Sequence, residues 1–172
     1  MIRKGTPADL DRAEEIYNEI LDQQAAAVNY TNWVKGVYPT REDARRALEA
    51  GTLFVMEEGG EVVGVANLNH IQPPEYAKLS WSVPARGEEV LVIHTLCIHP
   101  ACSGRGYARA FVAFAAEHGR SLGCKAIRLD TYEGNLPAIS LYSALGFRDA
   151  GSALFHFENA IWETLRCFEC PL

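Results

Sequence analysis

A glycine-containing turn between a predicted strand and a predicted helix is the segment best suited to chemistry. The turn reads Ser103-Gly104-Arg105-Gly106-Tyr107-Ala108, and it follows an apolar, β-branched run at 90–98. The first N–H groups of a helix have no partners within the helix, and the helix dipole adds positive charge there. Gly104 and Gly106 carry no Cβ, so the backbone can approach a ligand closely. The segment predicts a phosphate or pyrophosphate site, with a plain strand-to-helix turn as the alternative.

Two well-known phosphate-binding loops do not fit this turn. A P-loop requires Gly-Lys followed by Ser or Thr, whereas Tyr107 and Ala108 follow Gly106. A dinucleotide fingerprint requires a third small residue, and Arg109 stands in that place. The turn therefore indicates neither nucleotide hydrolysis nor nicotinamide binding.

Length and composition limit the class of protein. The chain has 172 residues, 48% hydrophobic and 22% charged, so we expect one soluble domain over 1–172. The net charge of −6 argues against nucleic acid as a partner. The start of the chain lacks a signal-peptide core, and no run approaches the roughly 18 apolar residues of a spanning helix, so we expect no membrane partner. Five cysteines without paired spacing favour reduced thiols and a cytoplasmic location.

Hydrophobic periodicity predicts an α+β fold with a mixed sheet and helices on both faces. Thr6 and Thr40 are predicted to begin the first two helices, with Asp43 completing a capping box for the second. A hairpin is expected at 58–60, and residues 69–87 should form a long loop. The remaining predicted elements are a first strand at 2–4, hairpin strands at 52–57 and 61–68, a strand at 90–98, a helix at 104–122, a strand at 126–131, a helix at 136–145 and a terminal strand pair at 152–157 and 161–168.

Five segments occur in a recognisable order along the chain. They are the opening Ile2 to Leu10, the hairpin, the strand Leu96-Cys97-Ile98-His99-Pro100, the turn 103–108, and Asn135-x-x-Ala138-x-x-x-Tyr142-x-x-x-Gly146-Phe147. In this order they resemble the GCN5-related N-acetyltransferases (GNAT), which transfer an acyl group from coenzyme A. The resemblance implies a mostly antiparallel central sheet with splayed central strands, acetyl-CoA as cosubstrate, and no metal.

The resemblance also assigns the coenzyme-binding residues. The pyrophosphate of acetyl-CoA would lie on the amides of Ser103, Gly104, Arg105, Gly106, Tyr107 and Ala108. The pantetheine arm would pair with the backbone of Leu96 and Ile98 where the central strands splay apart. Asn135 would contact the pantetheine or adenosine side, and it could also cap the following helix. The family turn begins with Arg or Gln, so Ser103 departs from it and removes a long side chain near the pyrophosphate.

Acetyl transfer to an amine requires three kinds of group. An amine with its usual pKa of about 10 must lose a proton, through a base or through water. The carbonyl oxygen gains negative charge and needs a donor, for which the resemblance implies the amide of Leu96. The departing thiolate benefits from an acid, and Tyr142 stands at the position of the family's general acid. The alternative for Tyr142 is aromatic packing on the sheet.

His94 is the residue that we predict to act as the base. Strand alternation would place its side chain on the same face as Leu96 and Ile98. Related arylalkylamine acetyltransferases carry histidine at a comparable place. The alternatives are a structural role for His94, and a base at Glu88 or Glu89 acting through water, or at His70.

The acceptor is predicted to be a primary amine of a small molecule or peptide. Several aromatic side chains could form an apolar or cation-binding wall for it, and the alternative is that they belong to the core or to a homodimer interface. These side chains are Tyr30, Trp33, Tyr38, Tyr76 and Trp81. Acylation of an oxygen or of a protein lysine or N-terminus would differ only in this pocket.

The cysteines suggest two further roles, and the sequence supports neither. Cys167 and Cys170 form a Cys-x-x-Cys, but no second ligand pair accompanies them, so we expect no zinc site. Cys97 and Cys102 lie near the expected thioester, yet direct attack by the amine needs no covalent acyl-enzyme. The sequence thus predicts an acetyl-CoA-dependent N-acetyltransferase using a ternary complex; the alternative is a non-catalytic acyl-CoA-binding sensor or regulatory module.

Overall fold

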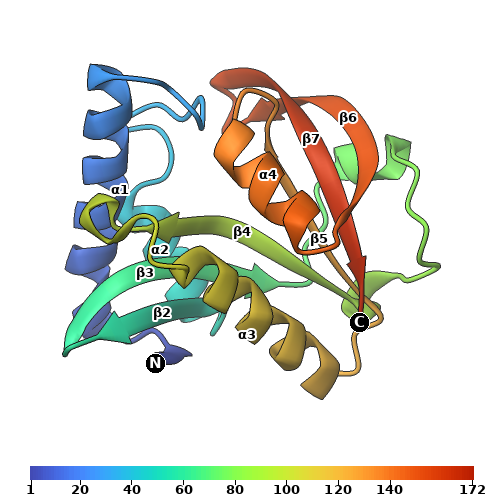
Figure 1. Cartoon of the computed structure of the whole chain (residues 1–172), viewed down its shortest axis with the longest axis horizontal. Helices are drawn as coiled ribbons and strands as arrows, with labels where there is room; N and C mark the ends of the chain where they lie inside the picture. The colour runs from blue at the N-terminus through green and yellow to red at the C-terminus, as the bar shows by residue number, and fades with distance from the viewer. The chain divides into compact units, whose positions relative to one another are not determined.

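The computed structural model describes residues 1–172, and it contains seven strands and four α-helices (Figure 1). The strands are β1 (Ile2–Lys4), β2 (Leu53–Glu58), β3 (Glu61–Asn69), β4 (Val90–Ile98), β5 (Ala126–Tyr132), β6 (Arg148–Phe157) and β7 (Ile161–Pro171). The helices are α1 (Leu10–Ala26), α2 (Arg41–Glu49), α3 (Tyr107–Ser121) and α4 (Leu136–Ala144). The strand order is β1-β2-β3-β4-β5-β7-β6. β4 and β5 are parallel, whereas the pairs β1–β2, β2–β3, β5–β7 and β6–β7 are antiparallel, which confirms the predicted mixed α+β sheet.

The chain divides into two compact units. The first contains 1–29, 33–68 and 94–114, and the second contains 30–32, 69–93 and 115–172. β4 and α3 each contribute residues to both units. The single domain expected from the chain length stays a prediction.

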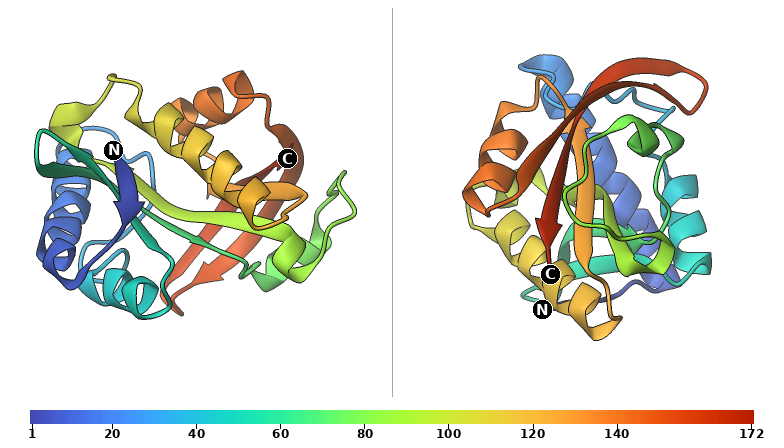
Figure 2. Two further views of the ribbon diagram at one scale, coloured as in Figure 1. Left: turned by 90° about the horizontal axis from the view of Figure 1, so that it is seen from below. Right: turned by 90° about the vertical axis from the view of Figure 1, so that its right-hand side faces the viewer.

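The first unit is built around β1, β2, β3 and the end of β4, with α1 and α2 on one face and the start of α3 on the other (Figure 2). Both predicted helix starts are confirmed. The Thr6 N–H donates to Asp9 Oδ2 at 2.7 Å before a short 3-10 turn, Pro7–Asp9, and the Thr40 N–H donates to Asp43 Oδ2 at 2.7 Å before α2. These bonds satisfy backbone groups that the first helical turn leaves without partners.

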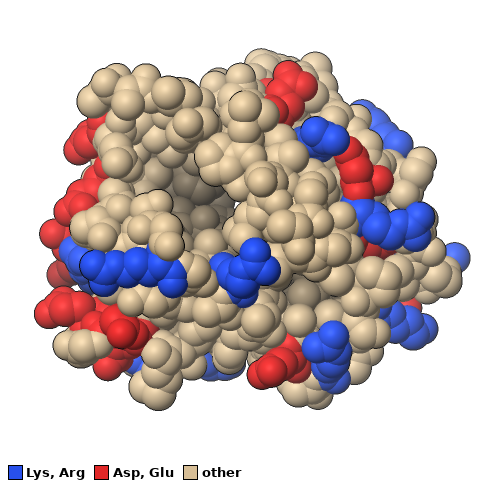
Figure 3. Space-filling view, viewed as in Figure 1, with Lys and Arg blue, Asp and Glu red and all other residues tan.

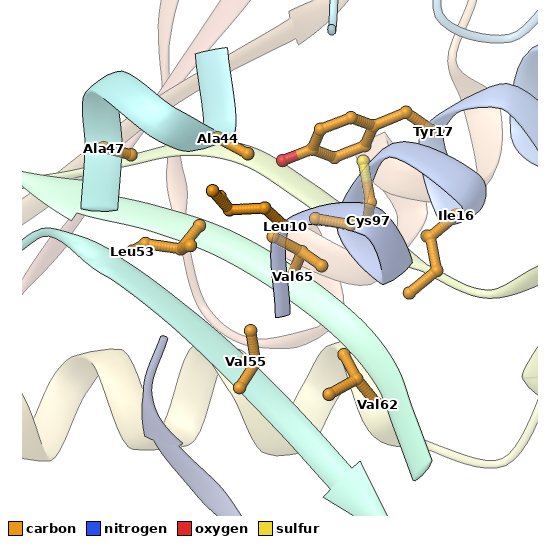
Figure 4. Packing of buried hydrophobic residues seen from close by; sticks show 11 residues of the cluster. Leu10, Ile16, Tyr17, Ala44, Ala47, Leu53, Val55, Val62, Val65 and Cys97 are labelled. Atoms are coloured by element: carbon orange, nitrogen blue, oxygen red, sulfur yellow. The ribbon is translucent and has the colours of Figure 1, made fainter. Parts of the chain in front are cut away.

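Apolar side chains from α1, α2, β2, β3 and β4 form the core of the first unit (Figure 4). Ile16, Val55 and Val65 are completely buried there, and Cys97 of β4 packs beside Tyr17 of α1. On the opposite face, the rings of Phe54 and Phe114 lie 5.4 Å apart. The end of β4 is therefore held by packing from α1.

In the second unit, α4 and the segment 69–89 lie on opposite sides of β5 and β7 (Figure 2). The segment 69–89 contains two 3-10 helices, Pro74–Lys78 and Gly87–Glu89, and it packs on the sheet through Tyr76 and Ala85. The Arg128 guanidinium lies 4.4 Å from the Trp81 ring centroid and donates from Nη2 to the Val83 carbonyl. The predicted long loop is thus fastened to the sheet by specific contacts.

Several element boundaries differ from the sequence prediction, and three of them differ by three or four residues: the start of α3, the start of β6 and the end of β7, which lies at Pro171 rather than at 168. α3 begins at Tyr107 rather than at 104, because Gly104 and Gly106 have φ of 76° and 80°, which a helix does not allow. β6 begins at Arg148 rather than at 152, since its first residues pair with β7 around an irregularity between Asp149 and Gly151. No helix is both long and apolar enough to cross a membrane.

Candidate functional site

The turn between β4 and α3 has the backbone geometry of an anion site. Residues Ser103 to Gly106 are exposed, and α3 starts immediately after Gly106. The first intrahelical bond is donated by the Ala110 N–H to the Gly106 carbonyl at 3.0 Å. The N–H groups of residues 107–109 therefore have no partner within the helix and lie at its positive end. Gly104 and Gly106 have positive φ, which favours glycine. Crowding is not the reason for glycine here, because a Cβ at either position would have no atom within 4 Å.

The charge around the turn also suits an anion. Arg105 and Arg109 are both exposed, so their side chains can reach a ligand placed before α3. Figure 3 shows basic side chains over the start of α3, while acidic side chains line the edge formed by α1. The net charge of the chain is −6, so the region around the turn is basic although the chain as a whole is acidic.

The strand leading to the turn is interrupted at Thr95. This residue has φ of 51°, a left-handed conformation that is rare for a β-branched residue. Its hydroxyl is hydrogen-bonded to the hydroxyl of Tyr38. Strained backbone of this kind is common at ligand sites, and it alters the direction of the backbone groups beside it. Sequence reasoning missed Thr95, because nothing in its type predicts a positive φ.

The interruption at Thr95 separates His94 from Leu96 and Ile98. Regular alternation does not extend across Thr95, so it gives no basis for placing His94 on the face of Leu96 and Ile98. All three side chains are half-buried. Ile98 packs over β3, where its Cδ1 lies 2.8 Å from the position of a Cβ built on Gly64. The role of His94 stays a prediction.

The other base candidates lie in the second unit, and the side chains of Glu89 and His70 each have a partner there. Glu89 pairs with Lys125 at 2.5 Å, and this hydrogen bond lowers the pKa of Glu89, which makes it a weaker base. Glu88 is exposed and lies beside it in the same 3-10 helix, Gly87–Glu89. His70 Nδ1 lies 2.8 Å from the Val90 carbonyl, so Nδ1 carries the proton in this contact.

His99, just after β4, connects the turn to α1. The Ala101 N–H donates to His99 Nδ1 at 3.2 Å, so the ring proton of the neutral form lies on Nε2. His99 Nε2 lies 2.7 Å from Glu19 Oε2 in α1. Sequence reasoning assigned no role to His99, and the structure shows that it helps to fix the approach to the turn.

Tyr142 lies in α4 and Asn135 lies immediately before it, both in the second unit. Tyr142 is buried, with its ring centroid 5.7 Å from that of Phe147 and 5.9 Å from that of Phe168. Asn135 caps α4, because its Oδ1 accepts from the Ala138 N–H at 3.2 Å. The capping role expected of Asn135 is therefore confirmed, and its contact with coenzyme A stays a prediction.

The predicted aromatic wall is made of separate ring pairs. Trp33 and Tyr38 meet edge to face at 5.6 Å in the first unit, and Tyr76 and Trp81 lie 4.9 Å apart in the second. Tyr38 and Tyr76 are buried, which supports the alternative that they are core residues. Tyr30 is half-buried and belongs to the second unit.

The cysteines are placed as packing residues. Burial raises the pKa of the Cys97 thiol well above its usual value, which opposes a thiolate nucleophile. Cys167 is buried on β7, and Cys102 and Cys170 are half-buried. No group of three or more His, Cys, Asp or Glu side chains is arranged to hold a metal ion.

Comparisons with known proteins identify the family. Residues 13–147 match the model of the Acetyltransferase (GNAT) family. N-acetyltransferase family 8 member 2 from Rattus norvegicus is 28% identical over 128 residues, which cover 66% of this chain and 52% of that protein, so the chain spans about half the length of this relative.

Solved structures agree on the fold. A GNAT-family acetyltransferase from Streptococcus agalactiae 2603 has a TM-score of 0.85 at 19% identity, covering 100% of this chain and 95% of that chain. The yncA protein from Salmonella typhimurium, solved with its cofactor acetyl-CoA, has a TM-score of 0.71 at 20% identity, covering 100% and 93%. From the family match and this fold, the chain belongs to the GNAT acetyltransferase family.

Proposed function

We propose that the chain transfers an acetyl group from acetyl-CoA to a primary amine, by direct attack of the amine within a ternary complex. The turn before α3 carries this proposal, because Gly104 and Gly106 hold positive φ and leave the N–H groups of residues 107–109 without helical partners. These donors and the exposed Arg105 fit a pyrophosphate. Membership of an acetyltransferase family makes acetyl-CoA the pyrophosphate compound that fits best.

The residues of β4 supply the remaining contacts in this proposal. The backbone of Leu96 and Ile98 pairs with the amide-rich pantetheine arm, and the Leu96 N–H donates to the thioester oxygen as it gains charge. Acetyl-CoA supplies the activated acetyl group. The left-handed conformation of Thr95 supports this assignment, since it interrupts the regular strand immediately before Leu96.

Two side chains would move the protons. We assign the base to His94, with water or the carboxylates Glu88 and Glu89 as alternatives, and the acid for the departing thiolate to Tyr142. The contacts of Tyr142 with Phe147 and Phe168 fix its side chain in place, and they fit the acid role and the packing role equally. A His94→Gln variant with an unchanged rate and pH profile would reject the base assignment.

The second candidate function is an acyl-CoA sensor without catalysis, which Ser103 favours because it departs from the family turn. Isothermal titration with acetyl-CoA and measurement of coenzyme A release with an amine panel separate the candidates. An enzyme binds acetyl-CoA and releases coenzyme A only when an amine is present. A sensor binds acetyl-CoA without any release, and a chain that does not bind acetyl-CoA fits neither.

A further inference from the structure

His99 is the residue immediately after β4, and three parts of the first unit meet at it. Its N–H donates to the Val63 carbonyl of β3 at 2.8 Å. Its ring Nδ1 accepts from the Ala101 N–H at 3.2 Å, and its Nε2 lies 2.7 Å from Glu19 Oε2 of α1. Only 14% of the His99 side chain is exposed, so the ring is held on most sides. The polar groups of His99 thus join β3, α1 and the chain that leads to the turn 103–108.

The chain between His99 and the glycine turn is a short 3-10 helix, Pro100–Cys102, which His99 caps through its ring. The Cys102 N–H donates to the His99 carbonyl at 2.8 Å, and the Ser103 N–H donates to the Pro100 carbonyl at 3.1 Å. Consecutive hydrogen bonds therefore run from His99 to Ser103, and the glycine turn begins at the next residue. A change in the orientation of the His99 ring would be passed along this bonded segment to the turn.

Helix α1 is the support from which Glu19 reaches the ring. It contacts the 3-10 helix Pro100–Cys102, and Figure 1 shows the two side by side. Two residues before His99, Cys97 of β4 packs beside Tyr17, which lies two residues before Glu19 in α1. Tyr17 and Cys97 are buried, whereas the Glu19 side chain is 42% exposed. The contact between Glu19 and His99 thus continues a core contact toward the surface.

The hydrogen bond from His99 to Glu19 selects the form of the ring that the cap requires. Nδ1 accepts the Ala101 N–H, so the neutral ring carries its proton on Nε2 and donates it to the Glu19 carboxylate. An acceptor at Nε2 favours this tautomer and fixes the plane of the ring. The charge of Glu19 acts in the opposite direction, because a carboxylate on the approach to an anion site repels the anion.

We propose that Glu19 and His99 form a positioning pair that holds the turn 103–108 in the conformation that receives the pyrophosphate of acetyl-CoA. The inference rests on the proposed function and adds two positioning residues to its coenzyme site. Neither side chain has to touch the coenzyme. Glu19 fixes the tautomer and orientation of the His99 ring, the ring caps the 3-10 helix, and that helix sets where the N–H donors of the turn lie.

Isothermal titration of acetyl-CoA into the full chain tests the pair. Glu19→Ala should weaken binding about fivefold, although it removes a negative charge near an anion. Glu19→Gln should stay within twofold of the unmodified chain, because its amide oxygen can accept the same hydrogen bond. His99→Asn keeps a side-chain oxygen that can cap the 3-10 helix but has no counterpart of Nε2, so it should also lose about fivefold. Combining Glu19→Ala with His99→Asn should add no further loss, since each removes the same hydrogen bond.

Glu15→Ala is the matched control. Glu15 is also a partly exposed carboxylate of α1, and it pairs with Arg12 rather than with His99. Its removal should leave acetyl-CoA affinity unchanged or slightly higher, which is the effect that charge alone predicts. The pair is overturned if Glu19→Ala binds acetyl-CoA as tightly as Glu15→Ala does, or if Glu19→Gln loses as much affinity as Glu19→Ala.

The amide resonances of Gly104 and Gly106 give a second measurement, which needs no ligand. In NMR spectra of the full chain, Glu19→Ala and His99→Asn should shift both glycine resonances, whereas Glu15→Ala should leave them in place. Unshifted resonances in Glu19→Ala would also overturn the pair. If the unmodified chain did not bind acetyl-CoA, the proposed function would fall, and the glycine resonances would still decide whether Glu19 and His99 position the turn.

Discussion

Arg128 and Glu169 form a buried ion pair across the β5–β7 ladder, with Nε and Oε2 2.9 Å apart. The other carboxylate oxygen, Oε1, accepts from the Ser82 N–H and hydroxyl and from the Val83 N–H, at 2.7 to 3.0 Å. Burial alone would raise the pKa of Glu169, but these hydrogen bonds together lower it. One carboxylate therefore joins β5, β7 and the segment 69–89.

Replacing Arg128 by Met should lower the free energy of unfolding by about 3 kcal/mol, because Glu169 would remain buried without its counter-charge. Arg166→Met is the matched control. Arg166 pairs with Asp149 at 2.6 Å, but both side chains are more than a third exposed, so the loss should stay below about 1 kcal/mol. Urea unfolding of both variants measures the difference. Equal losses would contradict the structural role given to the buried pair.

Glu163→Gln should change how stability depends on pH. The pKa of Glu163 is raised to about 7 by burial, from 4.5, so its contribution to stability is fully present below pH 4.5 and is lost as pH rises through 7. Relative to the variant, the unmodified chain should therefore lose thermal stability between pH 5 and pH 8. Melting temperatures across this range measure the effect, and parallel curves for the two proteins would disprove it.

Gly106→Ala should weaken acetyl-CoA binding at least tenfold, because φ of 80° strains a residue with a Cβ and redirects the amides of the turn. Gly60→Ala, in the β2–β3 hairpin with φ of 86°, carries the same strain away from the turn. Both variants should lose about 1 to 2 kcal/mol of stability. Isothermal titration should show the affinity loss only for Gly106→Ala. Similar affinities in the two variants would argue against the turn as the pyrophosphate site.

Ser103→Arg should raise acetyl-CoA affinity about two- to fivefold by restoring a long basic side chain to an exposed position. The gain should shrink at high salt, because exposed charges are screened. Titrations at low and high salt measure this. A variant with unchanged or lower affinity at both would show that the pyrophosphate does not lie near residue 103.

The sequence predicted the parts of the site that depend on local rules. The Thr40–Asp43 capping box and the glycine turn are encoded by neighbouring residue types, and both are present. The conformation of Thr95 could not be predicted in this way, because no neighbouring residue type calls for it and its hydrogen-bond partner, Tyr38, lies far away in the sequence. The burial of Glu163 could not be predicted either. In the sequence Glu163 looks like an ordinary surface acid, and its burial arises from strand pairing.

Tyr142→Phe should lower kcat about a hundredfold or more while acetyl-CoA affinity stays within twofold. Loss of the acid slows departure of the thiolate but leaves the coenzyme contacts in place. Steady-state kinetics together with isothermal titration measure the two effects separately. Full turnover in the variant would show that Tyr142 has only the packing role suggested by Phe147 and Phe168.

The release of coenzyme A from acetyl-CoA in the presence of primary amines tests the central claim most directly. A thiol reagent follows the release, with n-butylamine and 2-phenylethylamine among a broad panel of amines and amino acids. We predict release that depends on the amine and saturates with its concentration. Binding of acetyl-CoA without amine-dependent release from any member of the panel would contradict the account and support a sensor instead.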